Sequence, residues 1–115
     1  MITRAVIVAF ALALASSANA VTVTFKQYKE PKDDAERQLN SIYLSGVSDG
    51  LLSENAVLQS EGRLRVFCPP PTLAFTGSQA DDILKRAAQE VPKSDQLPIA
   101  VLLVAGLKQA FPCGK

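Results

Sequence analysis

Cys68 and Cys113 are the residues of this chain with the clearest chemical potential, because they are its only two cysteines. A redox couple usually has close Cys-x-x-Cys spacing, and a zinc site needs four ligands, which two thiolates and no histidine do not supply. In an oxidising compartment such a pair normally forms a structural disulfide. We therefore expect a Cys68–Cys113 bond, which would stabilise the fold by roughly 4 kcal/mol in the chain-entropy model.

The absence of histidine narrows the possible chemistry further. It excludes Ser-His-Asp and Cys-His arrangements and removes the commonest general base near neutral pH. Two adjacent carboxylate pairs remain, Asp33-Asp34 and Asp81-Asp82. Each pair lies where a helix is expected to begin, so we favour interaction with the helix dipole over an acid–base pair. The sequence thus predicts no enzyme, no cofactor and no metal site.

The first twenty residues have the organisation of a cleavable secretion signal. Arg4 precedes an apolar run over residues 5–15, and small residues at positions 17–20 form a cleavage site. The apolar run is too short to cross a bilayer of about 30 Å, which takes roughly 20 residues. We expect cleavage after Ala20, followed by a single domain over residues 21–115.

The charge of this domain is balanced. The chain has 12 basic and 11 acidic residues, and removal of Arg4 leaves 11 of each. Its basic residues are scattered among acidic ones and are not interleaved with aromatics, as at Lys26, Lys29, Lys85 and Arg86. The composition therefore favours neither a nucleic-acid partner nor another polyanion.

A long helix is predicted after residue 32. Asp33 or Asp34 can cap its first turn, and we expect it to continue to about Leu58 and to stop near Gly62. Apolar residues and glycines recur at helical spacing and define one face, which we expect to be buried. The residues on this face are Leu39, Ile42, Tyr43, Gly46, Val47, Gly50 and Leu51.

Gly46 and Gly50 lie one turn apart on this predicted face. A glycine inside a helix costs about 0.5–1 kcal/mol relative to alanine, so we expect another helix backbone to approach closely there. That helix can belong to the core of the same chain or to a second copy in a homodimer, and the sequence leaves both open. A helix that ends at Gly50 is an alternative that we favour less.

A second helix is predicted after a loop that contains Cys68 and three consecutive prolines. Thr76 and Gln79 have the spacing of a capping box. Beyond them, apolar positions alternate with charged ones at helical spacing, and Pro92 ends the pattern. We expect the apolar side of this helix to pack in the core.

A last helix is predicted to start near Ser94 or Gln96. Its residues 99–107 are apolar almost all round, which indicates a buried central helix that is too short to span a membrane. Residues 21–26 alternate as in a strand, with residues 64–67 as the only candidate partner, although such a segment can also be a tail. The predicted fold class is therefore all-α: a small disulfide-clamped bundle of three to four helices, with or without an N-terminal strand.

Three short motifs follow one another along this predicted helical domain. They are Tyr43-Leu44-Ser45-Gly46-Val47-Ser48-Asp49-Gly50, then Phe67-Cys68-Pro69-Pro70, then Ala110-Phe111-Pro112-Cys113. In this order and spacing, the motifs resemble those of the Rap/Tai family of periplasmic immunity proteins. The resemblance spans about residues 39–113, most of the expected mature chain.

The resemblance implies a periplasmic helical protein that protects a bacterium from peptidoglycan-cleaving amidase toxins delivered by type VI secretion. The implied partner is a cognate toxin. Cys68 and Cys113 match the family's disulfide cysteines, whereas Asn40 stands about where members often carry a further cysteine. The family's first-helix signature is matched at four positions: Tyr43, Gly46, Asp49 and Gly50.

A stoichiometric inhibitor needs a rigid surface, because rigidity lowers the entropy lost on binding. Two polar stretches, residues 53–65 and 92–97, are the candidate contacts, since the helices are expected to be committed to the core. The candidate partner-binding residues are Ser53, Glu54, Asn55, Lys93, Ser94 and Asp95. The alternative function is a small helical periplasmic chaperone or envelope stress protein without a dedicated toxin.

Overall fold

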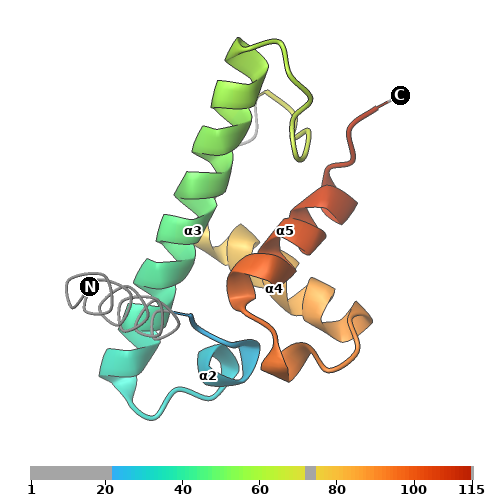
Figure 1. Ribbon diagram of the computed structural model, residues 1–115. Coiled ribbons are helices and arrows are strands. Elements are labelled where there is room, and N and C mark those ends of the chain that lie inside the picture. Colours follow the sequence, from blue (N-terminus) through green and yellow to red (C-terminus); the bar gives the residue numbers. More distant parts are fainter. Residues whose placement is uncertain (1–21, 72–74, 115) are drawn as a thin grey trace, which may run out of the picture.

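The computed structural model describes residues 22–71 and 75–114 and shows an all-α fold, as the sequence predicted. Four α-helices and one short 3-10 helix follow one another along these residues, and no strand is found among them (Figure 1). The elements are α2 (Phe25–Lys29), α3 (Asp34–Ser60), α4 (Gly77–Glu90), η2 (Ser94–Gln96) and α5 (Ile99–Ala110). The predicted secretion signal lies outside the described residues.

Helix α3 forms one long side of the molecule, and α4 and α5 lie against it (Figure 1). Asp33 is its N-cap: its carboxylate accepts a hydrogen bond from the backbone N–H of Glu36 at 2.8 Å. Asp34 lies in the first turn and forms an ion pair with Arg37. The predicted role of this aspartate pair at a helix start is therefore confirmed.

The buried face of α3 differs from the predicted one. Leu39 and Ile42 are 65% and 68% exposed, and Gly46 and Gly50 have no neighbouring atom within 4 Å of the position a Cβ would take. Only Tyr43, Val47 and Leu51 of the predicted face pack against the core, at its edge. The expectation that another helix of the same chain approaches the two glycines is wrong.

Hydrogen bonds explain how polar residues can lie on the inner face of the helix. Asn40, Ser48 and Asn55 are buried beside Leu44 and Leu58, and each polar side chain has a backbone partner. Asn40 donates to the Gln27 carbonyl at 3.1 Å, and Ser48 donates to the Leu44 carbonyl at 2.8 Å. Hydrophobic periodicity assigns polar residues to the exposed face of a helix. The predicted buried face of α3 therefore differs from the observed one, which contains these three polar residues.

Helices α4 and α5 form the centre of the core. Leu84 on α4 is fully buried, as are Ile99 and Leu103 on α5. Thr76 and Gln79 form the predicted capping box at the start of α4. Helix α5 begins at Ile99, after the 3-10 helix, and it is not buried all round, because Val101 is 54% exposed on the side that α3 and α4 leave uncovered.

The segment predicted as a strand forms none among its described residues, and its last two residues, Phe25 and Lys26, begin α2. Thr24 caps α2 with a capping box, and only this residue makes an isolated bridge, to Pro98. The Phe25 N–H donates to the Leu97 carbonyl and the Ile99 N–H donates to the Val23 carbonyl, both at 2.9 Å. The described residues around Thr24 therefore pair with the entry to α5, and not with residues 64–67.

Asp81 connects α2 to α4. The Tyr28 hydroxyl donates to one carboxylate oxygen at 2.5 Å, and the Lys85 ammonium lies 2.9 Å from the other. Because α4 begins at Gly77, the pair Asp81-Asp82 lies beyond the first turn, and the predicted role at a helix start is wrong for it. Burial of Tyr28, and then its bond to Asp81, raise the pKa of its hydroxyl above the ordinary value.

At Gly106, α4 lies close to the backbone of α5. A Cβ placed there would lie 2.7 Å from Cγ2 of Ile83 and 3.0 Å from the Ile83 carbonyl oxygen. We expect Gly106→Ala to lower the free energy of unfolding by about 1–3 kcal/mol, as overpacking does. Gly50→Ala, in open space on α3, is the matched control and should instead raise it by about 0.5–1 kcal/mol. Urea unfolding of both variants measures the difference, and equal effects would contradict the close contact.

The shifted pKa of Tyr28 predicts a pH dependence of stability. An unfolded tyrosine ionises near pH 10, whereas the folded state keeps Tyr28 protonated to higher pH. The contribution of the Tyr28 hydroxyl to the free energy of unfolding is fully present below pH 10. It is lost as the pH rises from 10 toward the higher pKa of the folded state. We expect the free energy of unfolding to fall less steeply above pH 10 in Tyr28→Phe than in the wild type. Identical slopes in denaturant titrations would refute this assignment.

Candidate partner-binding surface

The C-terminal end of α3 and the loop that follows it form the most exposed part of the first candidate stretch. Helix α3 ends in a Schellman motif: the Gly62 N–H donates to Gln59 and the Arg63 N–H donates to Leu58. Gly62 adopts a positive φ of 68°, which glycine takes without strain. The chain therefore leaves the helix in a fixed direction, and residues 61–67 turn back along α3. We call these residues the α3 loop.

Asn55 holds the α3 loop against the helix. Its carboxamide oxygen accepts from the Val66 N–H at 2.8 Å, and its nitrogen donates to the Phe67 carbonyl at 2.6 Å. The side chain is 5% exposed. Asn55 was predicted as a partner-binding residue, but its position shows that it supports the loop from below and does not lie on the surface.

The disulfide between Cys68 and Cys113 fixes the far end of the α3 loop, as predicted. Its two Cα atoms are 4.8 Å apart, and the Cys68 N–H also donates to the Phe111 carbonyl at 2.8 Å. Phe67, just before the first cysteine, is almost completely buried in the core. The loop is thus held by the helix end, by an amide and by a covalent link to the end of α5.

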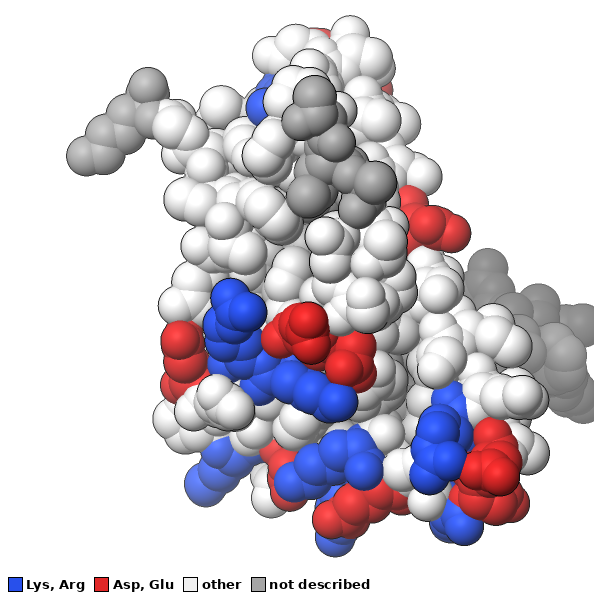
Figure 2. All heavy atoms as spheres, turned by 180° about the vertical axis from the view of Figure 1, so that it is seen from behind, with Lys and Arg blue, Asp and Glu red and all other residues white. Residues whose placement is uncertain are grey.

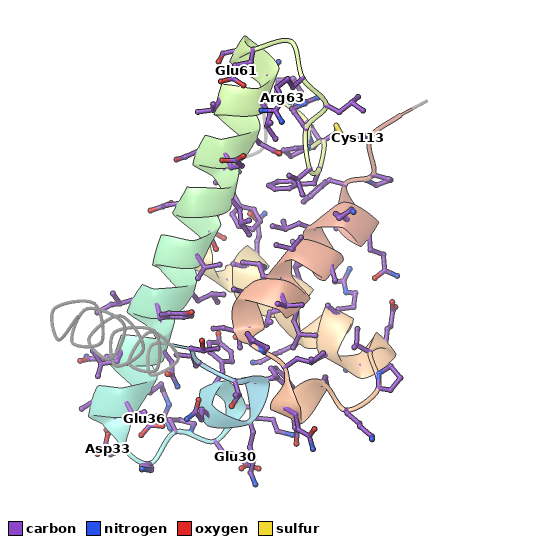
Figure 3. The ribbon with its side chains drawn as sticks, in the orientation of Figure 1. Glu30, Asp33, Glu36, Glu61, Arg63 and Cys113 are labelled. Carbon is purple, nitrogen blue, oxygen red and sulfur yellow. A yellow bond between two sulfur atoms is a disulfide. The ribbon has the colours of Figure 1, made fainter. Side chains whose placement is uncertain are left out.

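Leu64 lies at the tip of this supported loop and is 92% exposed. Arg63 and Arg65 flank it, and Arg63 forms an ion pair with Glu61 at 3.3 Å. In Figure 3, Glu61, Arg63 and Cys113 lie together at the end of the molecule farthest from Asp33. A rigid loop that offers an apolar side chain between two cations has the features of a protein-binding element.

The charges on the face opposite to that of Figure 1 are mixed in sign. On the face seen in Figure 2, Lys and Arg alternate with Asp and Glu, and most of them lie at one end of the molecule. Within the described residues, no cluster of acidic and sulfur side chains could hold a metal ion. None of the described helices combines the length and the apolarity that crossing a membrane requires.

Comparison with known families identifies the chain. The sequence model of the Rap1a immunity proteins matches residues 11–113. The chain belongs to this family. Neither the curated proteins nor the solved structures contain a significant match. Membership confirms the resemblance at the level of an effector immunity family and implies a toxin protein as partner.

Three of the four residues that carry the family resemblance in α3 are exposed. Gly46, Asp49 and Gly50 are exposed, and Tyr43 is half-buried at the edge of the core. In this Rap1a-family chain, the motif is therefore accessible from solvent. The helical spacing of apolar residues and glycines predicted that Tyr43, Gly46 and Gly50 face inward, whereas Asp49 was not part of that predicted face.

The two predicted contact stretches of the immunity protein are far apart. The turn at residues 92–97 lies near α2, whereas the α3 loop lies at the opposite end of the molecule (Figure 1). Lys93 is exposed with a φ of 56°, Ser94 is half-buried, and Asp95 forms an ion pair with Lys29 at 2.8 Å. The stretches cannot form one continuous surface. Ser53 and Glu54, on α3, remain exposed on the same helix as the loop's support.

Leu64 and Asn55 both lie in the candidate contact stretch 53–65, but the sequence did not predict the role of either residue in the loop. Leu64 was predicted to lie in a possible strand, because Leu64 and Val66 alternate with Arg63 and Arg65. Asn55 was counted as polar surface. No local signal distinguishes it, because its two hydrogen bonds reach residues 11 and 12 positions away.

Replacing Asn55 tests the support of the loop. Asn55→Leu keeps the approximate size but leaves the Val66 N–H and the Phe67 carbonyl without partners, at about 1–3 kcal/mol each. We expect the free energy of unfolding to fall by about 2–4 kcal/mol and trypsin to cleave after Arg63 and Arg65 faster. Ser53→Ala, on the exposed side of α3, should change stability by less than about 0.5 kcal/mol. Unaltered cleavage in Asn55→Leu would show that the amide does not hold the loop.

Proposed function

We propose that this chain is a periplasmic immunity protein that binds a peptidoglycan-cleaving amidase toxin delivered by type VI secretion and blocks its active cleft. Membership of the Rap1a family supports a toxin partner. The Cys68–Cys113 disulfide supports a location outside the reducing cytosol. The amidase activity of the toxin follows from the resemblance of the sequence motifs alone and is part of the proposal.

The single observation that carries the mechanism is the exposure of Leu64 on a loop with three supports. A side chain that protrudes from a rigid loop can enter a concave site, whereas a helix face presents a flat surface. Transfer of a leucine side chain from water to an apolar pocket contributes about 1.5–3 kcal/mol. Because the loop is already ordered before binding, little of this free energy is offset by conformational entropy lost from the loop.

The charges beside Leu64 indicate the chemistry of the matching site. Arg65 extends from the same loop, and arginine commonly forms bidentate pairs with carboxylates at interfaces. The proposed toxin surface is thus an apolar pocket with acidic groups at its rim. Occlusion needs no turnover, in keeping with the lack of histidine in the whole chain.

A neutralisation assay tests the function. A peptidoglycan amidase that binds the wild-type protein is sent to the periplasm of a susceptible strain together with wild-type protein or Leu64→Asp, and lysis is followed. We expect protection by the wild type and loss of protection by the variant. In binding measurements, the variant should be at least about 30-fold weaker, which corresponds to the 2 kcal/mol of a hot-spot residue.

Val101→Asp is the matched control, because Val101 is also an exposed apolar residue but lies on α5. It should protect like the wild type, and melting curves should show that both variants fold. Protection by Leu64→Asp at wild-type level would exclude the loop as the occluding element. If no hydrolase binds, and pull-downs instead recover many aggregating clients, the proposed function itself fails in favour of a chaperone.

A further inference from the structure

A small, mostly apolar pocket lies between α4 and α5. Each helix contributes three residues to it at helical spacing (i, i+3 and i+4), so one side of each helix lines the pocket. The six residues are Ile83, Arg86, Ala87, Gly106, Gln109 and Ala110, and we call this site the α4–α5 pocket.

The size of the α4–α5 pocket limits what it can bind. Its volume is about 200 Å³. Sites for cofactors and other small molecules have roughly 300–1,000 Å³, whereas a cavity of about 150 Å³ admits a benzene ring. The pocket is therefore too small for a cofactor and has room for one side chain.

Small residues create the α4–α5 pocket. A Cβ placed at Gly106 would lie 3.1 Å from the Cβ of Ala87, so the two helices touch at this point. Both residues are buried, whereas Ala110 is exposed in the last turn of α5. The methyl groups of Ala87 and Ala110 are too short to fill the space beside the contact. The pocket is thus a property of the residue types at the crossing of the two helices.

Arg86 gives the α4–α5 pocket its charge. The residue is exposed at the rim and forms no ion pair with any other described residue. Asp82 and Glu90 lie one helical turn before and after it on α4, yet neither carboxylate pairs with it. A guanidinium at the edge of an apolar space favours a carboxylate of a second molecule, because exclusion of water strengthens the ion pair.

Gln109 adds a hydrogen-bonding group to the rim from the other helix. A carboxamide both donates and accepts, so it can pair with the backbone N–H and C=O groups of an extended chain. Together with the apolar floor and Arg86, it defines the chemistry of the ligand. The α4–α5 pocket suits a protein segment that has an apolar side chain next to an aspartate or a glutamate.

The α4–α5 pocket lies at the end of α5 that the disulfide joins to the α3 loop. Ala110 is the last residue of α5, and the carbonyl of the next residue, Phe111, accepts a hydrogen bond from the Cys68 N–H at 2.8 Å. Cys68 follows Leu64 by four residues, which span at most about 14 Å. An interface of standard size covers about 800 Å² per partner. One partner can therefore reach both the pocket and the tip of the α3 loop.

We infer that the α4–α5 pocket receives an apolar side chain of the bound toxin, and that Arg86 pairs with an acidic residue next to that side chain. The inference rests on the proposed function and adds a second contact to it. The two contacts are reciprocal, because Leu64 enters the toxin while a side chain of the toxin enters this pocket. The acidic residue agrees in charge with the acidic groups proposed to face Arg65.

Two pairs of matched variants test the pocket by titration against the amidase. Ala110→Trp fills the pocket, whereas Ala105→Trp places the same side chain at an exposed position of α5 outside it. Arg86→Glu reverses the charge at the rim, whereas Lys108→Glu reverses an exposed charge that does not line the pocket. We expect Ala110→Trp and Arg86→Glu each to weaken binding by at least about 10-fold, and both controls to stay within about 2-fold of the wild type. Melting curves verify that all four variants fold.

Nitrogen-15 NMR of the free protein provides a second measurement, which does not need the toxin. The probes are acetyl-Phe-Asp-amide and, as the control, acetyl-Phe-Lys-amide. We expect the acidic probe to shift the backbone amide signals of Ala87 and Gly106, and the basic probe to shift neither, because Arg86 repels it.

Equal affinities of Ala110→Trp and Ala105→Trp for the amidase would overturn the inference, and the proposed function would still stand if Leu64→Asp loses protection. Equal shifts with both probes, or shifts with neither, would overturn the ligand chemistry assigned to the pocket. A wild type that binds no amidase contradicts the proposed function, and with it the toxin as the occupant. If Ala110→Trp alters only the sedimentation of the free protein, a second copy fills the pocket and the inference is wrong.

Discussion

The covalent link between Cys68 and Cys113 is the constraint on which the upper part of this molecule depends. It joins the chain just after the α3 loop to the chain just after α5, across 45 residues. The last turns of α3 extend toward this link, and the loop returns from them to the body of the protein (Figure 1). Because the return path ends in the disulfide and in buried Phe67, the loop between them has few conformations available. The exposure of Leu64 is therefore a fixed property of the fold.

Buried polar groups decide how α3 sits on the core. Asn40, Ser48 and Asn55 each replace an apolar side chain on the inner face, and each has a hydrogen-bond partner on the backbone. A buried amide without a partner would be costly, so the bonds of Asn40 to Gln27 and of Asn55 to Phe67 favour this orientation of the helix, whereas Ser48 bonds within α3. The consequence appears on the opposite side of α3, where leucine, isoleucine, valine and two glycines are left in contact with water.

The sequence by itself determined the helical class, the caps and the disulfide. Asp33, the Thr76–Gln79 capping box and Gly62 act within three or four residues of their own positions, so local pattern is sufficient to find them. The cysteine pair was predictable because the chain offers no other partner for either residue.

Only the tertiary structure decided which face of α3 is buried, that Thr24 adjoins Pro98, and that Leu64 is exposed while Asn55 is not. Each of these outcomes depends on groups brought together from distant parts of the chain. A polar side chain can be buried where another part of the chain provides a hydrogen-bond partner. An apolar side chain stays exposed where no other element packs over it. Spacing along a single helix contains neither piece of information, because hydrogen-bond partners and covering surfaces are set by how the helices pack.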